Sequence, residues 1–171
     1  MAFGTQNGIK RYDNPRKEHT MKKTLKILLI IVLAIIVLVG VLLLVVNSSL
    51  NSAAKLQTYD FGSDKIPSFN SVVGERKVTG VGSSSSTNGT QQKDYTYETQ
   101  SRDDDLDAYY DALKSAGFLV LKPMDGNTLK GSMQLGIASA DEGKIILIDL
   151  SWDNAKVSVA LAKGDGTITP N

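Results

Sequence analysis

The hydrophobic and polar positions divide this chain into three parts of different character. Residues 1–26 are mostly polar, residues 27–46 are almost entirely aliphatic, and residues 47–171 mix short apolar runs with polar turns. Only the third part shows the alternation from which a folded domain can be built. We therefore expect a polar head, one long apolar helix and one domain.

The apolar block has the length and composition of a membrane span. All of its twenty residues except one Ala and one Gly are Ile, Leu or Val. A helix of that length, at about 1.5 Å per residue, extends about 30 Å, which is the thickness of a bilayer's hydrocarbon core. The block therefore predicts a single transmembrane helix, with the lipid bilayer as its partner. Positions along this span are Ile27, Leu33, Gly40 and Val46.

The charge distribution sets the expected orientation of this helix. Residues 1–26 hold seven Lys/Arg against two Asp/Glu, whereas residues 47–171 hold twelve against sixteen. Because positive residues beside a span stay in the cytoplasm, Lys22, Lys23 and Lys26 predict a cytoplasmic N-terminus at the plasma membrane. The C-terminal part is then extracytoplasmic. Its acidic balance argues against a nucleic acid as partner, since phosphate binding requires a positive surface.

The ends of the anchor leave alternatives open. Residues 1–26 have few apolar residues and predict a basic, disordered cytoplasmic head. Met21 opens the sequence MKKTLK, so translation can start at Met1 or at Met21. A weak cleavage pattern ends at Ala54, and cleavage there would release a secreted binding domain. A cleaved signal has an apolar region of about 7–15 residues, so the longer block favours a permanent anchor.

The pattern after the block predicts a small α+β domain. Residues 47–70 are expected as a polar stalk and linker, although the sequence leaves open whether residues 56–70 pack against the domain or form a first short element. The domain itself covers residues 71–171. Its strands are expected at 75–82, 93–100, 118–122, 132–139, 144–152 and 156–162, with polar loops at 83–92 and 123–131. Short turns between such strands make them antiparallel, which predicts a ββαββββ order with one helix packed on an antiparallel sheet.

The helix of this domain is expected at residues 101–118. Ser101 or Asp103 can cap its first turn, and Gly117 is a natural left-handed stop. One apolar stripe follows from the helical spacing of Leu106, Tyr109, Tyr110 and Leu113. A stripe of this width must cover a sheet face.

Little in the sequence indicates catalysis. The chain has no cysteine, and its one histidine, His19, lies in the head. The acidic run that begins at Asp103 fails as a calcium loop, because Ala108 stands where Gly is needed and Lys114 where Glu is needed. We therefore expect no metal, no cofactor and no enzyme. A weak hydrolase of envelope polymers stays as the less favoured alternative, because paired carboxylates cannot be recognised from sequence spacing.

A binding surface is the remaining kind of site. The polar loop and the aromatic residues of the domain supply its candidates, namely Ser83, Asn88, Tyr95, Tyr97 and Trp152. The aromatic residues fall on apolar faces of the predicted strands, so core packing is the favoured interpretation for them.

Two stretches carry a resemblance. DDLDAYYDALKSAGF and GKIILIDLSW resemble small, exported, membrane-anchored bacterial domains, over about residues 66–171. This resemblance implies no particular activity and no site residues. Together with the anchor it leads us to expect a single-pass, non-catalytic binding or accessory domain of the cell envelope, with an envelope protein or a cell-wall component as partner.

Overall fold

A computed structural model describes residues 15–126 and 129–168, with side chains from Lys26 onward. The described chain divides into two compact units, the first ending at Val45 and the second beginning at Val46. Of the head that was expected to be disordered, residues 1–26, only residues 15–26 are among the described residues. Helix α1 (Pro15–Ala54) begins inside that head. Proline is favoured at the first helical position, which fits the start of the helix at Pro15, and residues 15–26 are helical rather than irregular.

The apolar part of α1 dominates the first unit. Its aliphatic side chains are exposed by between 47% at Val39 and 72% at Leu38. Residues Lys26–Ala54 are long and apolar enough to cross a membrane, and a signal sequence near the N-terminus has the same properties. Lys26 is exposed at the start of this segment, while the side chains of Lys22 and Lys23 lie outside the description.

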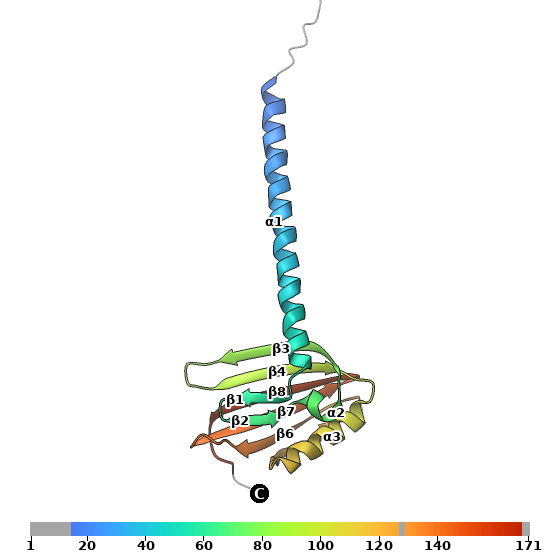
Figure 1. The fold of residues 1–171 in the computed structure, drawn as a ribbon, viewed down its shortest axis with the longest axis vertical. Coiled ribbons are helices and arrows are strands. Elements are labelled where there is room, and N and C mark those ends of the chain that lie inside the picture. Colours follow the sequence, from blue (N-terminus) through green and yellow to red (C-terminus); the bar gives the residue numbers. More distant parts are fainter. Residues whose placement is uncertain (1–14, 127–128, 169–171) are drawn as a thin grey trace, which may run out of the picture. The chain divides into compact units, whose positions relative to one another are not determined.

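The second unit confirms the predicted α+β fold. Its main elements follow the order ββαββββ: β3 (Lys77–Ser85), β4 (Gln91–Glu98), α3 (Arg102–Ser115), β5 (Leu119–Gly126), β6 (Lys130–Ala138), β7 (Lys144–Asp153) and β8 (Lys156–Asp165). The six strands form one sheet in the order β3-β4-β8-β7-β6-β5, and every neighbouring pair is antiparallel. Figure 1 shows α3 lying across one face of this sheet.

That face, which we call the inner face, holds the core. Alternate residues of β7 and β8 are buried, as their period of two predicts. Leu106, Tyr109 and Leu113 of α3 are buried with them, and Tyr110 is partly buried. Gly117 has φ +93° just after the helix, which confirms the expected left-handed stop. Ser101 is the N-cap position, although its side chain makes no capping hydrogen bond.

The segment left open by the sequence also belongs to this core. A two-stranded hairpin, β1 (Thr58–Phe61) and β2 (Asp64–Pro67), is followed by the short helix α2 (Phe69–Val73). The hairpin and α2 lie on the same side of the sheet as α3 (Figure 1). Tyr59, Phe61, Ile66 and Phe69 are almost completely buried, which is why the segment packs instead of linking. The last turns of α1, expected as a polar stalk, are likewise helical.

Two expected loops are shorter in the structure. Ser83, Ser84 and Ser85 continue β3 and pair with β4, so only residues 86–90 connect the two strands. Strand β5 does not end at Pro123 but continues to Gly126. It is an edge strand with register shifts, so the missing N–H of a proline disrupts no ladder on its outer side.

Candidate functional site

The predicted binding residues separate into two groups. Tyr95, Tyr97 and Trp152 all lie on the inner face and are at most 7% exposed, so they belong to the core. Tyr95 stacks on Tyr59 at 4.5 Å between ring centroids, and the Tyr97 hydroxyl lies 2.6 Å from the Tyr59 hydroxyl. Burial raises the pKa of Tyr97 to about 12, with a smaller opposing effect from the Tyr59 hydrogen bond. These rings stabilise the fold and present no stacking surface.

The other two predicted residues, Ser83 and Asn88, are exposed, whereas the three rings are buried. Ser83 lies in β3, and Asn88 lies in the connection to β4, where its side chain accepts a hydrogen bond from the backbone N–H of Thr90. A side chain used to shape a turn in this way is a common structural role for Asn. The structure therefore does not bring the five predicted residues together into one surface.

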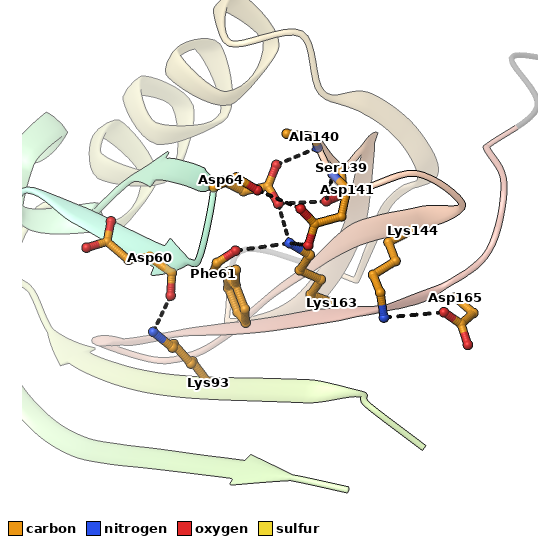
Figure 2. Close-up of polar contacts among 11 residues, drawn as sticks. Asp60, Phe61, Asp64, Lys93, Ser139, Ala140, Asp141, Lys144, Lys163 and Asp165 are labelled. Carbon is orange, nitrogen blue, oxygen red and sulfur yellow. Dashed lines mark hydrogen bonds and ion pairs between the residues drawn. The ribbon is translucent and has the colours of Figure 1, made fainter. Parts of the chain in front are cut away.

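A charged cluster forms around Lys163, whose side chain is only 5% exposed. The Lys163 ammonium donates to Asp64 Oδ2 at 2.6 Å, to Asp141 Oδ2 at 2.7 Å and to the Phe61 carbonyl at 3.0 Å. Asp64 also accepts from the Ser139 hydroxyl at 2.6 Å and from the Ala140 N–H at 2.8 Å. Figure 2 shows these groups converging from the β1–β2 hairpin, from β8 and from the turn after β6.

This geometry makes the cluster a structural clamp between hairpin and sheet. Burial alone would raise the pKa of Asp64, but hydrogen bonds from Ala140, Lys163 and Ser139 outweigh it and hold the pKa below its usual value. Burial would lower the pKa of Lys163, and its two carboxylate partners reverse that into a rise. Lys163 is therefore a protonated cation with three acceptors. It has no lone pair with which to activate the Ser139 hydroxyl, which already donates to Asp64.

A sequence signal for this cluster exists. Lys163 continues the period-two face of Val157, Val159 and Leu161 by one more step, yet the predicted strand ended at residue 162. Extending the strand places a lysine on the buried face. A buried lysine requires a paired carboxylate. Its partner Asp64 could not be identified from the sequence, because the hairpin that carries it was not predicted.

A second charged pair holds α3 in place. Arg76 binds both carboxylate oxygens of Asp105 at 2.7 Å, and the Thr99 hydroxyl donates to the same carboxylate. Asp105 is only 4% exposed, so this member of the acidic run is buried against Arg76 and Thr99. Burial would raise the pKa of Asp105, and the hydrogen bonds from Arg76 and Thr99 lower it instead.

Part of the opposite face of the sheet, the outer face, carries polar side chains in regular rows. The strand registers align four hydroxyl residues on four adjacent strands; this hydroxyl row consists of Ser132, Ser151, Ser158 and Thr96. Adjacent strands lie about 4.8 Å apart, so the row extends about 14 Å across the sheet. The Thr96 and Ser158 hydroxyls lie 3.3 Å apart.

Two further rows flank the hydroxyl row. On one side, the mixed polar row contains Lys122, Gln134, Asp149, Ala160 and Asp94. On the other side, the charged row alternates in sign through Lys130, Asp153, Lys156, Glu98 and Lys77. Opposite charges on adjacent strands stabilise a sheet face, and Lys77 and Glu98 form an exposed ion pair at 3.0 Å.

A cleft opens where the hydroxyl row meets the edge of the sheet. Strand β5 has one residue more than β6 at two places, between Val120 and Lys122 and between Lys122 and Asp125. Such bulges bend an edge strand away from its partner. The resulting β5 cleft has a volume of about 640 Å³, and its lining includes Lys122, Met124, Asp125, Ser132, Gln134 and Asp149. Gln134 donates to Asp149 at 2.8 Å within it.

Residues 26–126 and 129–168 contain no group of three or more His, Cys, Asp or Glu side chains arranged to hold a metal ion. Comparison of the chain with protein-family models, with curated proteins and with solved structures finds no match. Function must therefore be argued from the geometry of the anchor, the clamp and the outer face.

Proposed function

We propose that this protein is a single-pass membrane protein that displays a non-catalytic binding domain outside the cell. The N-terminus is cytoplasmic, the apolar part of α1 spans the plasma membrane, and residues 47–171 lie on the extracytoplasmic side. The domain acts as a binding or accessory module of the cell envelope, with an envelope protein or a cell-wall component as partner.

The observation that carries this proposal is the exposure of the apolar part of α1. Twenty consecutive residues without a charge have their side chains in the surroundings rather than in a core. In water that surface would be strongly unfavourable, at about 25 cal/mol for each Å² of exposed apolar area. In a bilayer the same surface meets hydrocarbon, and each backbone group is satisfied within the helix. Five Lys/Arg lie in the fifteen residues before the span and one, Lys55, lies in the fifteen residues after it, and this excess favours the cytoplasmic N-terminus.

The contacts of residues 50–54 favour a permanent anchor over the secreted alternative. Ala53 is buried in the core of the second unit, and Leu50 packs against it. Asn70 donates from its side chain to the Ala54 carbonyl at 3.1 Å. Cleavage after Ala54 would remove all of these contacts, so the domain that we describe is better formed by the uncut chain.

The enclosed polar groups favour binding over hydrolysis. Hydrogen bonds that join one part of the fold to another already engage the charged groups of Lys163, Asp64 and Asp105. A general acid for glycoside cleavage needs a carboxyl whose pKa is raised. The carboxyl pKa shifts resolved in the domain are downward, including those of Asp64, Asp105 and Asp141.

Intact mass and cysteine labelling test the proposal together. The C-terminally tagged protein, purified from separated membrane and medium fractions, should have a mass starting at Met1 or Met21 and occur in the membrane. Because the chain has no cysteine, Asp111→Cys and Thr24→Cys report on one side each, and both starts retain Thr24. We expect a membrane-impermeant maleimide to label Asp111→Cys in intact cells and Thr24→Cys only after lysis. A mass starting at Lys55 in the medium, or the reverse labelling, would overturn the proposal.

A further inference from the structure

The part of the outer face that carries the three rows is not covered by the hairpin, α2 or α3, whereas farther along β6 Ile168 of the C-terminal segment lies over Gly136 beside Leu121 and Leu147. The hairpin, α2 and α3 lie on the inner face (Figure 1), and the side chains of the hydroxyl row are partly or fully exposed. Some neighbours of these hydroxyls are small, including Gly80, Gly82 and Ala160, whereas the flanking rows also hold long side chains such as Gln134, Lys156 and Glu98. The hydroxyls are partly or fully exposed between these rows, so a ligand can reach them.

The charge of this face selects against a polyanion. The three rows, together with Asp125 at the end of the hydroxyl row, hold four lysines against five carboxylates, a net charge of −1. The lysines of the charged row each lie beside an acidic residue on the next strand. Binding of nucleic acids or other polyphosphates requires clustered positive charge, which these rows lack.

The composition of the face also selects against a protein partner. The centre of a protein interface is usually enriched in aromatic residues, Met and Arg. The hydroxyl, mixed polar and charged rows contain no aromatic residue and no Arg. Their groups are hydroxyls, an amide, carboxylates and ammonium groups, which offer hydrogen-bond donors and acceptors at close spacing.

The β5 cleft supplies a starting point on this otherwise flat surface. Small-ligand sites are concave, with a few polar groups that fix orientation beside apolar walls. In the cleft, Ser132 and Asp125 face the same hollow as the Gln134–Asp149 pair, and Met124, which is 58% exposed, forms an apolar wall. Ser132 is also the first member of the hydroxyl row, so the cleft and the row are continuous.

We infer that the β5 cleft and the hydroxyl row together bind a neutral glycan strand that lies across the strands of the sheet. A sugar unit in the cleft contacts Met124 with its C–H groups and exchanges hydrogen bonds with Ser132, Gln134 and Asp149. Successive units follow the row through Ser151 and Ser158 to Thr96. This inference rests on the proposed function, because it identifies the cell-wall component that an extracytoplasmic domain would meet.

The test uses the purified full chain in lipid nanodiscs, titrated with the β-1,4-linked hexamers of N-acetylglucosamine and glucose and with heparin as the anionic probe. Ser151→Ala and Ser158→Ala each remove one hydroxyl from the row, and Ser115→Ala on the exposed end of α3 is the matched control. One hydrogen bond of average strength corresponds to about a fivefold change in affinity. Emission of Trp152, the single tryptophan, verifies that each variant is folded.

We expect at least one neutral hexamer to bind, each row variant to weaken it about fivefold, and Ser115→Ala to leave it unchanged. Absence of binding by both neutral hexamers would overturn the inference. So would equal affinity of the row variants and wild type, or binding of heparin alone. Because this titration uses purified protein, its result is independent of the cysteine-labelling result, and failure of one is distinguishable from failure of the other.

Discussion

Replacing Lys163 by Met tests whether the charged clamp holds the β1–β2 hairpin on the sheet. The substitution keeps most of the side-chain volume and removes the ammonium group. Asp64, whose side chain is 11% exposed, then loses its cation, and the Phe61 carbonyl loses its donor. Removing one partner of a buried pair commonly costs about 3–5 kcal/mol, because the remaining charge is left without compensation.

The lower end of that range applies here. Asp64 keeps its hydrogen bonds from Ser139 and Ala140 after the substitution, and water reaches the cluster through the half-exposed Asp141. We therefore expect Lys163→Met to lower the free energy of unfolding by about 3 kcal/mol. For a unit of this size the corresponding fall in Tm is about 10 °C.

Thermal unfolding of the full chain in detergent micelles measures this change, followed by the emission of Trp152. That residue is buried in the second unit, so its emission reports on the domain and not on α1. Lys77→Met is the matched control, because Lys77 pairs with Glu98 at the surface and such pairs contribute little. Hydrogen exchange should be faster in residues 58–67 of the Lys163→Met variant. If both variants have the same Tm, the clamp contributes no more than an exposed ion pair and our interpretation is refuted.

Three further predictions concern pH and backbone conformation. As pH falls below the ordinary Asp value of 3.8, the stability contributed by the lowered pKa of Asp64 should be lost, and urea midpoints measured against pH should fall less steeply for Asp64→Asn. As pH rises above the ordinary tyrosine value of 10.0, stability should fall, since burial raises the pKa of both Tyr97 and Tyr59. The phenolate absorbance contributed by these two buried residues should then appear together with unfolding instead of before it. Gly117→Ala places a Cβ at φ +93°, 3.4 Å from Ile137 Cδ1, and should lower the unfolding free energy by about 1 kcal/mol; an unchanged denaturation midpoint would contradict this account of the helix stop.

Long periodic segments were the predictable part of this fold. The stripe of Leu106, Tyr109 and Leu113 identifies α3, and the alternation of β7 and β8 identifies both strands and their buried faces. In each case the burial of a whole face determines the structure, so the periodicity alone is sufficient evidence. The ββαββββ order followed from these elements and from the short turns between them.

The hairpin and α2 could not be predicted because each element has only four or five residues. So short a segment shows no periodicity, and its structure depends on partners far away in the sequence. Tyr59 illustrates this dependence, since its hydroxyl accepts from the Phe69 N–H and its ring stacks on Tyr95. The predicted end of the strand at Pro123 was wrong for a related reason. A proline is tolerated in an edge strand, and only the strand order shows that β5 lies at the edge of the sheet.

Strand order also explains why the polar rows of the outer face could not be predicted from the sequence, whereas the apolar inner face could. Inward residues are apolar on every strand, so their alternation is visible without knowing which strands are neighbours. The hydroxyl row exists only because β8 pairs with both β4 and β7, which aligns Thr96, Ser158 and Ser151. The inner face is occupied by the core and by the Lys163 clamp. If the domain binds a ligand as we propose, we expect the outer face or the strand edges to be used, because a substitution there can change the recognised ligand without removing a contact on which folding depends.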